Sequence, residues 1–154
     1  MRRVIQHIDT QMTDLDDIVE IFELLGDWDQ RYQYLTELGE KLPAMPAALK
    51  TEANKVKGCM SQVWVSAWRD EAQPQLINYY GDCDTSIIKG VLAVLIQLCA
   101  GKTETEIQQL DVDELFARLH LDEHLSPSRH VGIYAIVALM KQQASTLQSS
   151  AVVP

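Results

Sequence analysis

The segment SIIKGVLAVLIQLCAG, residues 86–101, is strongly apolar. Drawn as a helix it is apolar on almost every side, which is typical of a helix buried within a core. Asp84 or Thr85 stands before it as a capping residue, and Gly101 follows it as a stop. We therefore expect a central buried helix around which the rest of the chain is packed.

Two segments before this helix alternate with period two instead. In QVWVSAW, residues 62–68, the small aliphatic side chains alternate with two tryptophans, and the alternation resumes over residues 75–80. Such alternation predicts strands, and the polar Arg69-Asp70-Glu71 break between them predicts a hairpin.

Helical spacing returns on both sides of this hairpin and its following helix. Predicted helices span 14–26, a stretch from about Asp27 to Leu42, 103–110, 112–119, and Ser126 to about Gln143. The sequence thus predicts an α+β fold, in which a small antiparallel sheet packs with N-terminal and C-terminal helices. We expect one domain over residues 1–154, with flexible tails at 1–13 and 145–154.

Composition excludes several classes of function. The formal net charge of -9 argues against a nucleic-acid binder, which needs a basic surface. No segment has the length of a membrane span, and the N-terminus lacks the apolar run of a secretory signal. Three cysteines without paired spacing suit a reducing compartment. We therefore expect a cytoplasmic protein.

Cys59 is the strongest candidate for chemistry. It follows Gly58 and precedes the first predicted strand, at a junction where a side chain is accessible. A thiolate is the reactive form of cysteine, and Lys55 and Lys57 are nearby cations that favour it if they fold towards the sulfur. From these residues alone, the role of a small buried apolar residue is the favoured interpretation.

Four motifs in order resemble the SufE family, including its CsdE branch, and they favour the SufE side. Together they run from Trp28 to the start of the last helix: WDQRYQYLTELGEKLP at 28–43, GCMSQVW at 58–64, GDCDTSIIKG at 81–90 and LSPSR at 125–129. The resemblance implies a fold like that of the IscU-type cluster scaffolds. It also implies that Cys59 accepts sulfur from the persulfide of a cysteine desulfurase of the SufS or CsdA type.

The resemblance implies a covalent carrier and activator rather than a stand-alone turnover enzyme. The pyridoxal phosphate of the reaction belongs to the desulfurase, so we expect no cofactor or metal in this chain. The sulfur is carried as a persulfide on Cys59, for delivery to a downstream cluster-assembly scaffold or another sulfur acceptor. Apolar neighbours such as Met60 are expected to shelter the resting sulfur.

Three further residues are candidate supporting groups. Arg129 matches the family's arginine and is either a cation near the sulfur or a partner in an ordinary ion pair. Asp84 matches a family acid whose simpler role is to cap the central helix. Cys83 stands where the family commonly has serine. It is a partner that traps Cys59 as a disulfide, a second sulfur site, or a simple substitution in a loop. Cys99, at the end of the apolar helix, is expected to pack in the core.

Two alternative functions use the same thiols. An IscU-like scaffold would bind a cluster or zinc through Cys59, Cys83 and a histidine. A thiol redox protein would use Cys59 with Cys83 as its resolving partner. His120 and His124 have a helical spacing that suits a metal, but without a third ligand in register we expect them to be solvated residues at helix ends.

Overall fold

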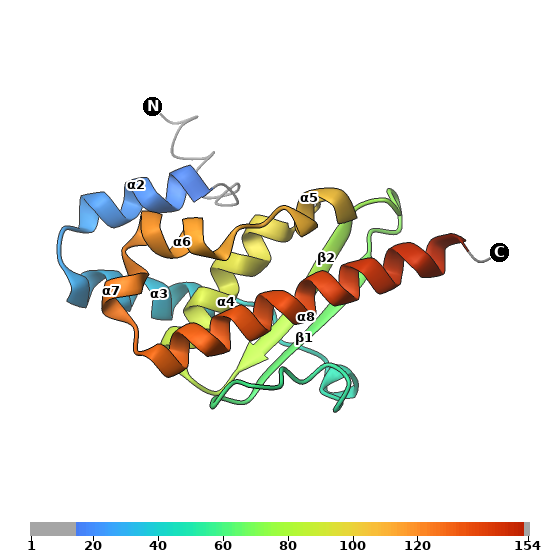
Figure 1. Ribbon diagram of the computed structural model, residues 1–154, viewed down its shortest axis with the longest axis horizontal. Coiled ribbons are helices and arrows are strands. Elements are labelled where there is room, and N and C mark those ends of the chain that lie inside the picture. The colour runs from blue at the N-terminus through green and yellow to red at the C-terminus, as the bar shows by residue number, and fades with distance from the viewer. Residues whose placement is uncertain (1–14, 153–154) are drawn as a thin grey trace.

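The computed structural model describes residues 15–152, and within them the fold is α+β, as predicted. Strands β1 (Val63–Arg69) and β2 (Ile77–Cys83) form an antiparallel pair, with Val63 opposite Cys83 and Arg69 opposite Ile77. Among the described residues these two strands make up the sheet. In Figure 1, α8 crosses the strands and most of the other helices lie towards one end of them.

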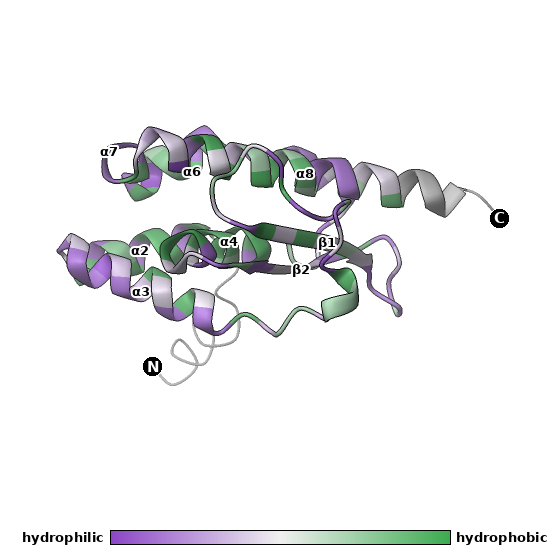
Figure 2. Cartoon of the chain, turned by 90° about the horizontal axis from the view of Figure 1, so that it is seen from below, coloured by the Kyte–Doolittle hydropathy of each residue, from purple (hydrophilic) through white to green (hydrophobic). Residues whose placement is uncertain are grey.

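Helix α4 (Ser86–Cys99) lies at the centre of the core, as its sequence predicts. In Figure 2 it is almost uniformly hydrophobic, whereas the outer helices carry hydrophilic residues. It packs against β2 and against α3 (Trp28–Glu40). A Cβ atom at Gly81 would lie 2.7 Å from the Ile96 side chain, and one at Gly90 would collide with the Leu35 carbonyl. Glycines therefore set how closely α4 approaches both neighbours.

Helix α8 (Pro127–Val152) runs across the strands and packs against β1 (Figure 1). The Tyr79 hydroxyl donates a 2.7 Å hydrogen bond to the Met140 carbonyl in α8. Gly81 faces α4 from the same strand, and residues two apart in a strand share a face. Helices α4 and α8 therefore cover the same face of the sheet.

Shorter helices complete the structure, with α6 (Val112–Leu119) and α7 (Leu121–His124) at the end nearer α2 (Leu15–Leu25) in Figure 1. Arg118 and Asp16 form an ion pair of 2.5 Å between α6 and α2. Thr103 and Glu106 form the predicted capping box. The remaining elements are the 3-10 helix η1 (Ala47–Leu49) and α5 (Glu104–Gln108).

The larger differences from the prediction concern β2, α7 and α8. Strand β2 begins at Ile77 and continues to Cys83, because Gly81 fits under α4 and the pairing extends to Val63. Helix α7 was not predicted, being a single turn whose Leu121 is buried. Helix α8 continues to Val152 instead of ending near Gln143, since Ala144 is buried and no helix breaker intervenes.

The predictions for the two tails have different outcomes. The flexible tail predicted at 1–13 lies outside the described residues. At the other end, residues 145–152 continue α8, and 153–154 lie outside the description. The prediction of a single domain over the whole chain stays a prediction.

Candidate functional site

Cys59 lies at the tip of a short loop that is closed at its base. The Val56 N–H donates to the Val63 carbonyl at 2.8 Å, and the Val65 N–H donates to the Asn54 carbonyl at 2.9 Å. Segment 54–56 therefore lies along β1, and residues 57–62 form the loop between them. Gly58 has φ +86°, in the left-handed region that suits glycine. The chain thus turns sharply just before Cys59.

The Cys59 side chain is half-buried and its thiol is free. Its sulfur rests against α8 at Gly132, where a Cβ atom would lie only 2.7 Å from Sγ. Met60, expected to shelter the sulfur, is 87% exposed. The Met60 side chain therefore points into solvent and does not cover the sulfur. The Cys59 sulfur is covered by α8 instead.

A cleft of about 270 Å³ opens beside Cys59. Arg129 and Asp84, both predicted from the sequence, line this cleft together with Cys59. They come from three separate parts of the chain: the Cys59 loop, the turn between β2 and α4, and the first turn of α8. The remaining lining residues are Met60, Ser61, Thr85, Ile88 and Ser128.

Asp84 ties the Cys59 loop to the start of α4. One carboxylate oxygen accepts the Gln62 N–H at 3.0 Å and the Thr85 hydroxyl at 3.2 Å. The Asp84 N–H donates back to the Gln62 carbonyl at 3.2 Å. The expected helix cap is therefore not formed by Asp84: Thr85 is the N-cap residue, and Asp84 serves the loop.

Two hydroxyl groups strengthen this attachment. Ser61 and Thr85 share a hydrogen bond of 2.7 Å across the same junction. The C-terminal half of the loop is thus held by three hydrogen bonds, while Cys59 itself lies beyond them. Ser61 belongs to the GCMSQVW motif, but the motif does not indicate this bond.

Arg129 lines the cleft and brings a positive charge to it. Within residues 15–152 its guanidinium forms no ion pair, so the expected first-turn pair is not present in the described structure. The side chain is partly buried, which keeps it near the cleft. A fixed cation beside a sulfur atom stabilises negative charge that develops there.

Lys55 and Lys57, the other expected cations, are engaged elsewhere. Lys57 forms an ion pair with Glu52, which holds the pKa of that carboxyl below its usual value. The Lys55 ammonium lies 6.0 Å from the centre of the Trp64 ring. Arg129 is therefore the cation that the structure places in the cleft.

Cys83 and Cys99 are both buried. Cys83 ends β2, rather than lying in a loop, and its sulfur accepts the Thr85 N–H at 3.4 Å. Burial raises the pKa of its thiol to about 11, with smaller contributions from Asp84 and Cys59. Burial raises the pKa of Cys99 to about 12, in agreement with its expected place in the core. Both thiols are neutral at physiological pH.

The histidines of the described residues do not assemble a metal site. His124 stacks on Trp28 with ring centres 3.8 Å apart, and His120 caps α6 in a left-handed conformation. In the described part of the chain, no three histidine, cysteine or acidic side chains gather as metal ligands. The set of Cys59, Cys83 and a histidine required by the scaffold hypothesis is therefore not formed by these residues.

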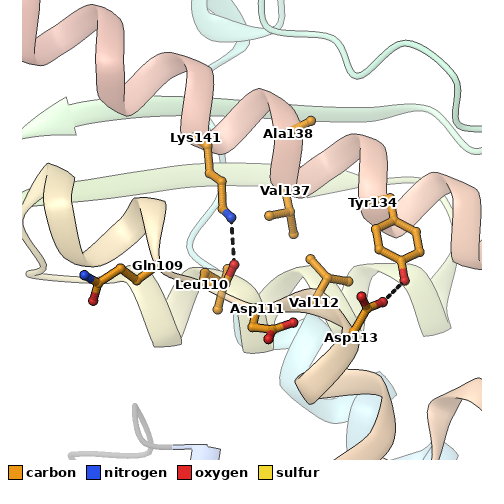
Figure 3. Close-up of a pocket in the computed structure, with 9 residues that line it drawn as sticks. All are labelled: Gln109, Leu110, Asp111, Val112, Asp113, Tyr134, Val137, Ala138 and Lys141. Carbon is orange, nitrogen blue, oxygen red and sulfur yellow. Dashed lines mark hydrogen bonds between the residues drawn. The ribbon is translucent and has the colours of Figure 1, made fainter.

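A larger cleft of about 490 Å³ lies between α8 and the segment from α5 to α6 (Figure 3). Two contacts cross it: Tyr134 donates to the Asp113 carboxylate, and the Lys141 ammonium donates to the Leu110 carbonyl at 2.7 Å. Tyr134 lies about 200° around the helix from Gly132. This cleft therefore opens on another face of α8 from the one that contacts Cys59.

Gly132 is the site residue that sequence analysis missed. It lies directly after the LSPSRHV segment, inside a helical pattern that is otherwise uninterrupted. A glycine in such a place is a recognised signal of close packing. The sequence does not show which residue packs against this glycine, however, because Cys59 is far from Gly132 along the chain.

Comparisons with known proteins agree on one family. The sequence model described as "SufE: Fe-S metabolism associated domain" matches residues 16–144. An uncharacterized SufE-like protein of Rhizobium meliloti is 38% identical, covering 86% of this chain and 96% of its own length. A second from Rhizobium etli is 37% identical, with 86% and 90% covered.

A solved structure has the same fold. It is the solution structure of a hypothetical protein from Thermus thermophilus, with a TM-score of 0.71 over 88% of this chain and 96% of that one. Its 20% sequence identity limits the comparison to the fold. Separately, no helix in the described residues is both long and apolar enough to cross a membrane.

Proposed function

The chain belongs to the SufE family of Fe–S metabolism associated domains, and from this premise we propose that Cys59 is a sulfur acceptor. In this proposal the chain acts in the cytoplasm with a pyridoxal-phosphate-dependent cysteine desulfurase and activates it. Cys59 carries the sulfur as a persulfide to a cluster-assembly scaffold or another acceptor. The observation that carries the proposal is the free Cys59 thiol on a loop beside a cleft lined by Arg129.

The transfer step is a thiol exchange. The Cys59 thiolate attacks the terminal sulfur of the desulfurase persulfide, forming a new S–S bond on Cys59. The S–S bond in the desulfurase breaks, and its cysteine leaves as a thiolate. The proton on the terminal sulfur stays with that sulfur as it moves to Cys59, and no external oxidant or reductant is consumed.

The geometry around Cys59 suits this chemistry. The cleft of about 270 Å³ has room for one added sulfur atom, and Arg129 supplies a positive charge beside it. A persulfide is ionised more readily than a thiol, so a cation at this position favours the loaded state. Contact with α8 removes part of the Cys59 surface from water, which supports protection of the cargo.

Exposed apolar side chains beside the cleft support docking of the desulfurase. Met60 is 87% exposed and Val131 is 57% exposed. Met60 lines the cleft beside Cys59, and Val131 lies on α8 about 100° around the helix from Gly132. Exposed apolar groups next to a reactive residue are typical of a protein interface.

Anaerobic incubation with a desulfurase and cysteine, followed by intact-protein mass spectrometry, tests the proposal. We expect additions of about 32 Da, removed by reductant and mapped to the Cys59 peptide. Cys59→Ser abolishes the addition, while the matched control Cys83→Ser retains it. An adduct on Cys83 alone, or sulfur acceptance without Cys59, contradicts the proposal.

The thiol redox alternative has less support. It needs Cys83 as an attacking thiolate, but burial raises the pKa of Cys83 to about 11. At neutral pH this thiol is therefore a poor nucleophile. Reaction of Cys59 with peroxide followed by a disulfide to Cys83 is the result that would favour this alternative.

A further inference from the structure

The second turn of α8 lacks a side chain at the point where the Cys59 loop crosses it. A Cβ atom at Gly132 would lie 2.7 Å from Cys59 Sγ, 3.5 Å from Cys59 Cβ and 3.8 Å from Cys59 Cα. The first distance is far shorter than a normal contact between carbon and sulfur. Even a methyl group at position 132 is therefore incompatible with the observed position of the sulfur.

The helix itself gives no reason for a glycine at this position. Glycine is among the poorest helix formers, and α8 continues through Gly132 to Val152. Gly132 is buried, and the three atoms nearest to its missing Cβ all belong to Cys59. The space left by Gly132 is therefore occupied by one specific side chain.

Gly58 meets a different requirement. A Cβ atom there would lie 3.9 Å from the Ala135 side chain, an ordinary contact, but its φ of +86° disfavours other residues. Gly58 thus permits the turn before Cys59, whereas the missing side chain of Gly132 leaves room for the Cys59 sulfur. Only the second of these residues acts on the sulfur directly.

We infer that Gly132 is a positioning residue that seats the Cys59 sulfur against α8 and so sets the balance between a retracted and an outward thiol. A side chain at position 132 drives the sulfur out of this seat towards the cleft beside Arg129. The functional consequence rests on the proposed function: the seat shelters the sulfur during carriage, and Cys59 leaves it to react with a partner.

Alkylation of the reduced full-length chain by iodoacetamide tests this inference without any partner. In Gly132→Ala we expect Cys59 to be alkylated about tenfold faster, because overpacking at this level shifts a two-state balance by roughly that factor. Peptide mapping separates Cys59 from the buried Cys83 and Cys99. A rate equal to that of the natural chain overturns the inference.

Thermal unfolding in two backgrounds identifies the source of the effect. With Cys59 present, Gly132→Ala lowers Tm by about 3 °C or more; with Cys59→Ala, the same change leaves Tm unaltered or raises it. If Gly132→Ala fails to fold, recovery of folding in the Cys59→Ala background still supports the seat. Equal loss in both backgrounds, or failure to fold in both, overturns it.

Sulfur loading distinguishes this inference from the proposed function. A Gly132→Ala protein that still accepts sulfur is expected to lose it to reductant faster than the natural chain does. If the natural chain accepts no sulfur on Cys59, the proposed function fails. The inference about Gly132 is then tested by the alkylation rate and the Tm alone.

Discussion

Asp84 controls the Cys59 loop through one carboxylate group, which accepts the Gln62 N–H and the Thr85 hydroxyl. We expect Asp84→Ala to lower the free energy of unfolding by about 1 kcal/mol, as for one or two exposed hydrogen bonds. Because the loop loses its anchor, Cys59 is also expected to react faster with iodoacetamide. Urea unfolding and alkylation kinetics measure the two effects.

A matched control is available in the turn between the strands. Asp70 accepts the N–H groups of Ala72 and Gln73 at 2.8 and 3.0 Å, and it lies at the opposite end of β1 from the Cys59 loop. Asp70→Ala should cost similar stability and leave Cys59 reactivity unchanged. Similar acceleration in both variants would mean that general loosening, rather than the Asp84 anchor, exposes the thiol.

Arg129 is expected to act on sulfur acceptance rather than on stability. Its guanidinium forms no ion pair within the described residues, so Arg129→Gln removes charge from the cleft without breaking one. Loss of a charge-assisted contact predicts about tenfold slower loading of Cys59. The loading rate by mass spectrometry is the measurement.

Arg118→Gln provides the comparison for Arg129, because it breaks the ion pair with Asp16 on another surface. Exposed pairs of this kind contribute about 0–1 kcal/mol. We expect Arg118→Gln to alter stability slightly and loading not at all. Equal loading in the natural chain and Arg129→Gln would remove Arg129 from the reaction.

At the scale of single residues, the sequence motifs identify the candidate reactive residues but not the residues that contact them. Cys59, Asp84 and Arg129 were identified by matching residue types in order, and the structure brings them to one cleft. Their partners were not predictable in the same way. The Gly132 contact depends on two segments meeting in space, and hydrogen bonds to Asp84 depend on how the loop folds.

At the scale of elements, Gln143 attaches α8 to the edge of β1 that faces away from β2. Its amide donates to the Val65 carbonyl at 2.8 Å and to Asn54 Oδ1 at 3.2 Å, and its oxygen accepts the Ala67 N–H at 3.0 Å. Gln143→Ala leaves these partly buried groups without partners. We expect it to lower the free energy of unfolding by about 2 kcal/mol, measured with urea.

Gln142 is the natural control, since it is the adjacent residue in α8 and is exposed. Gln142→Ala should change stability by about 0.5 kcal/mol or less. Hydrogen exchange gives a local test, because the Ala67 amide loses its acceptor only in Gln143→Ala. Unchanged protection of Ala67 would contradict the assigned role of Gln143.

The elements predicted best are those whose sequence contains both a capping residue and a regular apolar spacing. Helix α6 was predicted with its observed ends, Val112 and Leu119, and its cap residue Asp111 accepts the Glu114 N–H. Strand β2 was placed two residues early at its start and three residues short at its end, because Gly81 and Asp82 are weak strand formers. Packing of Gly81 under α4 outweighs that local preference.

For the whole molecule, buried thiols predict a loss of stability in alkali. Burial raises the pKa of Cys99 from 9.0 to about 12, so only the unfolded chain ionises this thiol between those values. Its contribution is complete below pH 9 and is lost as the pH rises towards 12. We expect the free energy of unfolding to fall by about 1 kcal/mol by pH 10 through Cys99.

Cys99→Ala separates this effect from other alkaline changes. The variant is less stable at every pH because it leaves a small cavity, but its stability should fall less steeply between pH 8 and pH 10. Urea unfolding at a series of pH values gives both slopes. Parallel curves for the two proteins would show that Cys99 does not ionise on unfolding in this range.

The attachment of α8 to β1 also bears on association between molecules. Unpaired strand edges are templates for the addition of another chain, and a small sheet has a large share of edge. Here the outward groups of β1 from Val63 to Ala67 are occupied by segment 54–56 and by Gln143. On the other side, Ile77 exchanges hydrogen bonds with Gly101 and Lys102. Side chains and loops thus take the place of further strands along β1 and at the start of β2.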